Sequence, residues 1–382
     1  NAPDSATSTF QIGTRRSILA RVQTDQVIKL LQAVSPHHVF VVQAMATTGD
    51  NNQSTALHKF AEKSLWTQEL EVLLLNRSLD FIVHSLKDMP TQLPMDLELG
   101  CVTARHDPRD ALVVKSALRD RFHDLTHLPE GSVVGTSSLR RIAQLKRHHP
   151  HLRFADIRGN IGTRLAKLDD PHSEYHAIVL AAAGLQRLGM LERVSSFLTK
   201  DSGGMLHAVG QGALGIESRV GDERVQELLR GIGCEKTTRQ VLAERSLMRT
   251  LEGGCSVPIG VETEWVSSTT PLAQGSGIGI RPAAEYDVVS GLARPSSPAD
   301  TSAKTSGPSS QTSSDELIMR AIVVSLDGTE AAEVETRKMI SSREDADEFG
   351  RDVARMLVER GADTILQNIR RNRGIIQDQG GA

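Results

Sequence analysis

A cysteine at position 255 stands in the segment LEGGCSVPIG, residues 251–260, behind two glycines and ahead of a proline. Gly253 and Gly254 remove side-chain cover and free the backbone for conformations with positive φ. Four roles are open to the thiol: a buried structural group, a hydrolase nucleophile, a metal ligand or a covalent attachment point. No Cys–His signature of a hydrolase is evident and no partner cysteine lies nearby, whereas an exposed loop flanked by glycine suits attachment.

Arginines gather at three turns where a strand is expected to pass into a helix. The turns are IGTRRS (12–17), VVGTSSLRR (133–141) and IRGNIGTR (157–164). The free N–H groups and the dipole at a helix start favour anions, and guanidinium groups bind carboxylates or phosphates through paired hydrogen bonds. Three turns of the same design predict a ligand with several anionic groups, although each arginine alone also fits a solvated helix surface.

The segment from Arg140 to Arg164 carries seven Lys or Arg against one acid, Asp156, in a chain of net charge −3. RNA is the competing polyanion for such a segment. Aromatic residues make up only 3% of the chain, and the interleaved aromatics that stack on bases are missing from this segment. A small ligand rich in carboxylates or phosphates is therefore the better match.

A carboxylate follows the apolar strand in DFIVHSLKDMPTQLP, residues 80–94. The strand ends near His84 and is followed by Ser85, Lys87 and Asp88. Ligand sites form at strand ends in open α/β sheets, so Asp88 is a candidate to stabilise a cation that develops during a reaction. An aspartate shortly before a proline is also a common turn cap, and the residues alone leave both roles open.

The order of elements that must position these groups predicts two α/β domains followed by a small α+β domain. Three cysteines in 382 residues fit a reducing compartment, and no apolar run is long enough to cross a membrane. The N-terminal residues do not resemble a secretory signal, so the cytoplasm is the expected location. Strands are expected at 10–13, 38–44, 80–85, 110–114, 132–137, 152–157, 176–182, 258–265, 317–328 and 331–340. Helices are expected at 17–33, 66–75, 138–149 and 238–254, with a further helix from Asn160 and a long helix from about Arg343.

An ordered set of segments runs over about residues 10–262 and includes IGTRRSILARVQTD, VHSLKDMPT, RHDPRDALV, VGTSSLRRIAQL, IRGNIGTRLAKL, HAVGQGALGIE and ERSLMRTLEGGCSVPIG. Taken together, these segments resemble the porphobilinogen deaminase (hydroxymethylbilane synthase) family. The sequence departs from the family in two places: Trp66 stands where many members have phenylalanine, and an insertion at about 264–316 lengthens the third domain.

The resemblance implies two domains like periplasmic binding proteins around a cleft, and a third α+β domain that carries the cysteine. The expected boundaries are 1–105 for domain 1, with a return at about 205–230, 106–204 for domain 2, and 231–382 for domain 3. The insertion at 264–316 is expected to be disordered, because Pro295–Ser314 has 15 Ser, Thr, Pro or Gly in 20 residues. Residues 47–64 would form a mobile loop over the cleft.

The resemblance also implies the chemistry. Cys255 would hold a dipyrromethane cofactor through a thioether, and four porphobilinogen units would be added to it with loss of ammonia before a linear tetrapyrrole is hydrolysed off. Asp88, with Lys87 beside it, would be catalytic and stabilise the azafulvene cation. The implied cofactor contacts are Ser85, Lys87, Asp88, Ser137, Ser138, Arg140, Arg141, Arg164 and Gln211, and the implied substrate contacts are Arg15, Arg16, Ser17, Arg158 and Arg187.

The same resemblance implies a cytoplasmic, monomeric transferase of heme and porphyrin biosynthesis with no metal, nucleic-acid or membrane partner. The alternative is a non-catalytic anion-binding module of the solute-binding type. That alternative does not account for the glycine-flanked cysteine.

Overall fold

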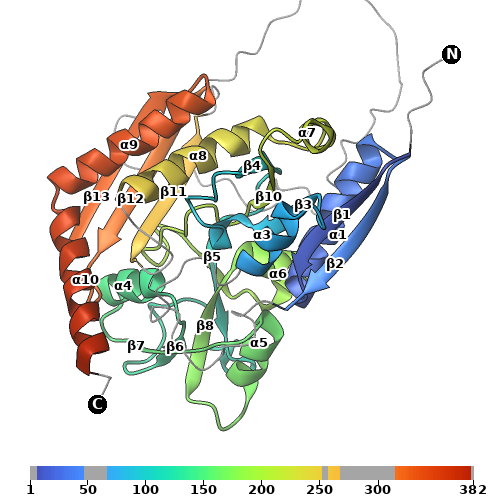
Figure 1. The fold of residues 1–382 in the computed structure, drawn as a ribbon. Helices are drawn as coiled ribbons and strands as arrows, with labels where there is room; N and C mark the ends of the chain where they lie inside the picture. The colour runs from blue at the N-terminus through green and yellow to red at the C-terminus, as the bar shows by residue number, and fades with distance from the viewer. Residues whose placement is uncertain (1–6, 47–66, 252–256, 267–314, 380–382) are drawn as a thin grey trace, which may run out of the picture.

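Three sheets organise the chain (Figure 1). The structure is a computed structural model that describes residues 7–46, 67–251, 257–266 and 315–379, without side chains beyond residue 371. Among these residues no helix combines the length and apolar character needed to cross a membrane. Two five-stranded α/β sheets and one three-stranded antiparallel sheet confirm the predicted fold class.

The first sheet has four strands from the N-terminal part of the chain and one from much later. β1 pairs in parallel with β2 and β3, whereas β10 is antiparallel to β3 and β4. Phe10, Ile12 and Phe81 form its core with the buried face of α1. In sheet order the strands are β2 (Val39–Met45), β1 (Thr9–Arg15), β3 (Phe81–Ser85), β10 (Leu214–Arg219) and β4 (Leu97–Val102), and the helices are α1 (Ile18–Val34), α3 (Gln68–Leu75) and α7 (Glu223–Arg230).

The second sheet has the same arrangement of directions. β6 pairs in parallel with β7 and β8, and β5 lies antiparallel to β8 and β9. Its apolar residues form two clusters, one around Leu112 and one around Ile178. In sheet order the strands are β7 (Arg153–Ala155), β6 (Val133–Gly135), β8 (Tyr175–Ala181), β5 (Asp110–Val114) and β9 (Ser196–Leu198), with helices α4 (Leu139–His148), α5 (Ile161–Asp169) and α6 (Ala182–Arg187).

The chain passes between these two sheets twice, after β4 and again after β9. In each case the first strand after the crossing, β5 or β10, enters its sheet antiparallel to a neighbour. Residues 103–109 and 199–213 therefore lie where the two sheets meet. The residue boundaries given above for the domains remain predictions.

The third sheet packs against helices on one side, as Figure 1 shows. Its order is β11 (Ile259–Trp265), β12 (Glu316–Val324) and β13 (Ala331–Met339), with helices α8 (Glu235–Thr250), α9 (Arg343–Glu359) and α10 (Ala362–Gln379). The predicted long helix from about Arg343 is confirmed by α9, which begins at that residue. Gly361 adopts φ +92, which breaks the helical path and separates α9 from α10.

The third domain contacts the second through α4. Ala143 of α4 and Leu206 lie in one buried cluster with Ile322 and Val324 of β12. Lys146, in the last turn of α4, donates to the carbonyl oxygen of Leu326 across 3.3 Å. Because α4 begins at the predicted turn 133–141, the third domain supports the helix that presents two of the candidate arginines.

Candidate active site

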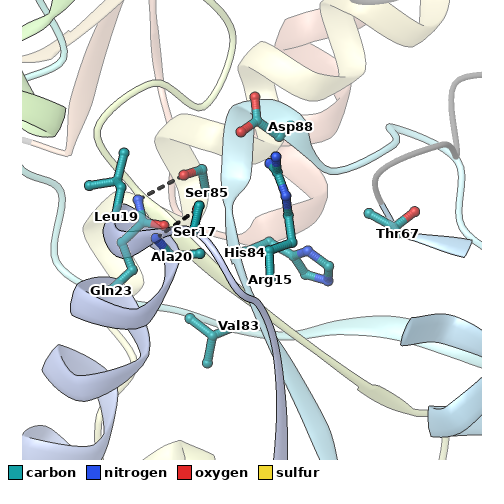
Figure 2. A pocket seen from close by; sticks show the side chains of 10 residues that line it. All are labelled: Arg15, Ser17, Leu19, Ala20, Gln23, Thr67, Val83, His84, Ser85 and Asp88. Carbon is teal, nitrogen blue, oxygen red and sulfur yellow. Dashed lines mark hydrogen bonds between the residues drawn. The ribbon is translucent and has the colours of Figure 1, made fainter. Parts of the chain in front are cut away.

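A small pocket, partly open to solvent, lies at the carboxyl ends of β1 and β3. Open α/β sheets form ligand sites at this edge. Figure 2 shows the side chain of Arg15 extending toward the carboxylate of Asp88. The lining residues are Arg15, Ser17, Leu19, Ala20, Gln23, Thr67, Val83, His84, Ser85 and Asp88. The structure thus brings together four of the predicted residues: Arg15, Ser17, Ser85 and Asp88.

Local hydrogen bonds fix the turn between β1 and α1. Ser17 is the N-cap of α1, and its hydroxyl accepts a hydrogen bond from the backbone N–H of Ala20. One turn later, Gln23 donates its amide to the Ser85 hydroxyl at 2.7 Å (Figure 2). The end of β3 is therefore tied to the first helix at the point where both line the pocket.

Lys87 and Asp88 lie in a short 3-10 helix, Leu86–Asp88, directly after β3. Lys87 Nζ donates to Gln211 Oε1 at 3.3 Å. The pKa of Lys87 is lowered to about 8: burial is the largest cause, Arg141 and Arg140 add to it, and Asp88 and Asp110 oppose it. The two catalytic candidates of the first sheet are thus in electrostatic contact with groups on the second.

Arg140 and Arg141 are buried and do not extend into open solvent. Both residues are 5% exposed. Arg140 Nη1 donates to Asp110 Oδ2 at 2.7 Å and to the carbonyl oxygen of Leu206 at 2.7 Å. Arg141 Nη2 donates to Asp110 Oδ1 at 2.7 Å, and its Nη1 donates to the carbonyl oxygen of Val179 at 2.7 Å. Their predicted contacts with a cofactor remain predictions.

Asp110 is the fully buried partner of both arginines. Burial alone would raise the pKa of its carboxyl group, but the guanidinium groups of Arg140 and Arg141 hold that pKa well below its usual range. Sequence reasoning missed this residue. Its position at the start of an apolar run predicted only a strand.

The turn before α4 is built from two serines. Ser138 is the N-cap of α4 and accepts from the backbone N–H of Arg141. The Ser137 hydroxyl donates to the carbonyl oxygen of Ile157 at 2.7 Å. Both hydroxyl groups therefore hold the turn, and their predicted cofactor contacts remain predictions.

The third turn places Arg158 and Arg164 around the start of α5, which Asn160 caps. Arg164 Nε donates to the carbonyl oxygen of Gly159 at 2.7 Å, and Arg158 Nε donates to Asp156 Oδ2 at 2.6 Å. Burial and then Arg141 lower the pKa of Arg164 to about 10, whereas Asp156 and Asp88 favour its charged form. Arg164 therefore lies within electrostatic range of Asp88.

Two other predicted substrate contacts lie apart from the pocket lining. Arg187 Nη2 donates to the carbonyl oxygen of Gly212 at 2.8 Å, and its Nε donates to Gln26 Oε1 at 3.3 Å. Burial lowers the pKa of Arg187 to about 10. Arg16 is exposed at the start of the first turn, where its backbone N–H bonds to the carbonyl oxygen of Met45.

Several predictions concern residues outside those that the structure describes. These are Cys255 with its two glycines, the loop at 47–64, Trp66 and most of the insertion at 264–316. Within the described ranges, no three His, Cys, Asp or Glu side chains gather as a possible metal site.

A buried pair behind the pocket was also missed. His84 Nε2 lies 2.8 Å from Glu217 Oε2, and both side chains are almost fully buried. The sequence placed His84 at the end of a strand, but its partner lies 133 positions away on β10. Nothing local in the sequence indicates such a pair.

The sequence matches two family models. The first is described as "Porphobilinogen deaminase, dipyromethane cofactor binding domain" and matches residues 10–227. The second is described as "Porphobilinogen deaminase, C-terminal domain" and matches residues 238–272. Together the two models span all three sheets in part or whole, so the resemblance is not confined to the arginine turns.

Curated relatives carry the same name. A porphobilinogen deaminase of Neurospora crassa is 44% identical over 369 residues, covering 96% of this chain and 95% of the relative. A porphobilinogen deaminase of Synechococcus elongatus is 54% identical over 263 residues, covering 69% of this chain and 80% of the relative.

Among solved structures, the methionine-binding protein MetQ is similar with a TM-score of 0.35 and 12% identity, covering 59% of this chain and 89% of that one. A likeness of this size carries no argument about function.

Proposed function

Because the chain belongs to the porphobilinogen deaminase family, we propose that it condenses four porphobilinogen molecules head to tail and releases one ammonia for each. The product is the linear tetrapyrrole hydroxymethylbilane, freed by hydrolysis, and the enzyme is a transferase of heme and porphyrin biosynthesis. One observation carries the proposal: Lys87, beside Asp88, is joined through Gln211 to Asp110, the carboxylate that holds Arg140 and Arg141. A carboxylate thus lies among cations that suit a substrate with acetate and propionate groups.

The charges in the site fit a dipyrromethane cofactor that carries carboxylates. Electrostatic interactions that shift one another's pKa values connect four cations with two carboxylates. The cations are Lys87, Arg140, Arg141 and Arg164, and the carboxylates are Asp88 and Asp110. Burial lowers the pKa of Lys87 to about 8 and that of Arg164 to about 10, so both cations are incompletely solvated. Anionic groups placed among them would stabilise their charged forms.

When bound, the cofactor supplies a free pyrrole carbon to which the substrate units are joined. We propose that Cys255, which precedes β11 in the sequence, holds it through a thioether. The residues proposed to hold its carboxylates and pyrrole N–H groups are Ser85, Lys87, Asp88, Ser137, Ser138, Arg140, Arg141, Arg164 and Gln211.

Asp88 is proposed to be the catalytic carboxylate. As ammonia leaves the substrate, positive charge develops on the pyrrole and its methylene carbon. A carboxylate already in place at the pocket stabilises that charge without reorganising when the charge forms. Lys87 is proposed to fix a substrate or cofactor carboxylate beside it.

The remaining basic positions are proposed to bind the carboxylates of incoming and added units. Arg15 and Ser17 line the pocket, and Arg158 lies at the third turn. Arg158 is paired with the more exposed Asp156, so a ligand carboxylate would compete with a partly solvated partner. Arg16 and Arg187 complete the set.

A non-catalytic anion-binding module is the alternative, and it does not account for Asp88. Such a module needs the arginines but has no use for a carboxylate among them, because a fixed anion opposes the binding of an anionic ligand. Asp88 lies at the pocket with the cations around it.

Product analysis tests the proposed reaction. The protein as purified, with its cofactor, is incubated with porphobilinogen while ammonia and hydroxymethylbilane are measured. The proposal predicts about four ammonia per tetrapyrrole, the ratio that its stoichiometry fixes. Porphobilinogen bound without ammonia release would favour the non-catalytic alternative and contradict the enzyme.

We also propose that the protein acts as a monomer in the cytoplasm. The sparse cysteine content is the support for a reducing compartment. Light scattering of the purified protein tests the monomer, and fractionation of cells that express the chain tests the location.

A further inference from the structure

Asp110, which has no assigned role in the proposed reaction, lies at the centre of a buried hydrogen-bond network. Its carboxylate accepts from Arg140 Nη1 at 2.7 Å, from Arg141 Nε at 3.1 Å and Nη2 at 2.7 Å, and from Gln211 Nε2 at 2.9 Å. The residue is 0% exposed. One carboxylate on β5 thus contacts two side chains of α4 and one from the segment that returns to the first sheet.

The orientation of the Gln211 amide follows from its partners. Its Nε2 donates to Asp110 Oδ1 and to the carbonyl oxygen of Pro108 at 2.7 Å, and both of these groups can only accept. Its Oε1 must therefore point the other way, where Lys87 Nζ donates to it. If the amide were turned by 180°, its NH2 group would face the ammonium of Lys87, and its oxygen would face two groups that can only accept.

The backbone around Gln211 is also fixed. Gly210 and Gly212 both adopt left-handed conformations, with φ +70 and φ +89. A Cβ on Gly212 would lie 2.4 Å from the carbonyl oxygen of His106, so no larger residue fits there. The N–H of Gly210 donates to Glu244 Oε2 at 2.8 Å. The backbone on both sides of Gln211 is therefore fixed. The hydrogen bonds of the Gln211 side chain connect Asp110 with Lys87.

We propose that Asp110 is a positioning residue, which acts through Gln211 to hold the Lys87 ammonium in place and charged, and directly to hold Arg140 and Arg141 beside it. The carboxylate does not need to touch substrate. It joins the Lys87–Asp88 pair of the first sheet and the arginine pair of the second into one unit. The role of Asp110 at the active site rests on the proposed function, whereas its effect on the protonation of Lys87 does not.

The charge on Lys87 reflects opposing neighbours from every side. Asp88, adjacent in the same 3-10 helix, and Asp110 on β5 favour the ammonium, whereas Arg140 and Arg141 on α4 oppose it. Burial also opposes it and is the largest effect. Removing the negative charge of Asp110 leaves two buried guanidinium groups facing Lys87 with less compensation, so Lys87 should lose its proton at lower pH.

The test is the titration of Lys87 in the full-length protein, followed by NMR of lysine labelled with carbon-13 at Cε. The Lys87 signal is assigned by its loss in Lys87→Arg. In Asp110→Asn we expect the pKa of Lys87 to fall by about one unit, the size expected when one charge is removed at this range in a partly buried site.

Asp107→Asn is the matched control. It removes one carboxylate from the crossing segment just before β5, where Asp107 pairs with Arg109 rather than with the buried arginines. It should leave the titration of Lys87 unchanged. A shift in Asp107→Asn as large as that in Asp110→Asn would overturn the proposal, because the effect would then be general.

Gln211→Met covers the case in which Asp110→Asn does not fold. It keeps the ion pairs of Asp110 but removes the carbonyl acceptor of Lys87, so the pKa of Lys87 should again fall. An unchanged titration in Gln211→Met would overturn the proposed link, as would an unchanged titration in folded Asp110→Asn. The titration requires no turnover, so failure to release ammonia would refute the proposed function and leave this inference standing.

Discussion

The ammonium of Lys87 donates to the side-chain carbonyl of Gln211 across 3.3 Å, and the same amide donates to Asp110. Gln211 thereby connects a residue that follows β3 with one that begins β5. The groups that surround the two catalytic candidates, Lys87 and Asp88, therefore come from both sheets. Their geometry depends on how the two sheets meet, and on the two crossing segments that lie there.

Replacing Asp88 with asparagine should lower kcat about 100-fold or more while leaving the folded protein intact. The amide keeps the shape of the side chain but loses the charge that stabilises a developing cation. The measurement is ammonia release at saturating porphobilinogen, with thermal unfolding as the check on folding. Asp96→Asn, an exposed change in the segment that follows, is the control and should retain normal turnover. Turnover near normal in Asp88→Asn would exclude the role of Asp88.

The rate of turnover should decline in alkali as Lys87 loses its proton; its pKa is about 8 without a bound carboxylate, and a bound carboxylate raises that pKa. The charged form exists below that pKa, so the carboxylate that Lys87 holds is bound at neutral pH and released in alkali. Lys87→Arg keeps the charge to higher pH and should move the decline in kcat/KM upward by at least about one unit. An alkaline decline that stays in place in Lys87→Arg would show that another group causes it.

The same pKa has a consequence for stability. The pKa of folded Lys87, about 8, lies below its ordinary value of 10.5 because burial disfavours the ammonium. Between these two values the unfolded chain binds more protons than the folded one, so the contribution of Lys87 makes the free energy of unfolding rise with pH. Urea unfolding of the native protein and Lys87→Met across that range should show the pH-dependent difference. If the free energies of unfolding of the two proteins changed in parallel with pH, the lowered pKa of folded Lys87 would be contradicted.

Arg105→Gln should lower the free energy of unfolding by about 3 kcal/mol or more, because it leaves Glu244 as an unpaired buried charge. Arg105 Nη1 lies 2.6 Å from Glu244 Oε1, with both side chains almost fully buried. Arg343→Gln provides the control, since its pair with Glu235 is about half exposed and should contribute at most about 1 kcal/mol. Equal losses in the two variants, measured by urea unfolding, would contradict the importance of burial.

Much of the fold could be predicted because its signals are local. Ser17, Ser138 and Asn160 stand just before apolar helix patterns, and each is the N-cap in the structure. The strand before Lys87 reads directly from a run of apolar residues. Helix caps and periodic apolar residues act over a few positions, so one sequence is enough to detect them.

The contacts that organise the site could not be predicted in the same way. Asp110 meets Gln211 across 101 positions, and Arg105 meets Glu244 across 139. The first pair forms because the chain returns through Gln211 to β10, and the second because α8 packs beside the segment that holds Arg105. No local pattern specifies either arrangement. Arg140 and Arg141 were identified from their residue type and their position in a strand-to-helix turn. Their burial against Asp110 depends on packing between distant segments.

Cys255 lies outside the described residues, so the attachment of the cofactor is best tested on the protein itself. The most direct measurement is the intact mass of active protein, followed by peptide mapping of residues 251–260. We expect one dipyrromethane unit linked to Cys255, and none in inactive Cys255→Ala. An unmodified mass in fully active protein, or an adduct on another residue, would contradict attachment at Cys255.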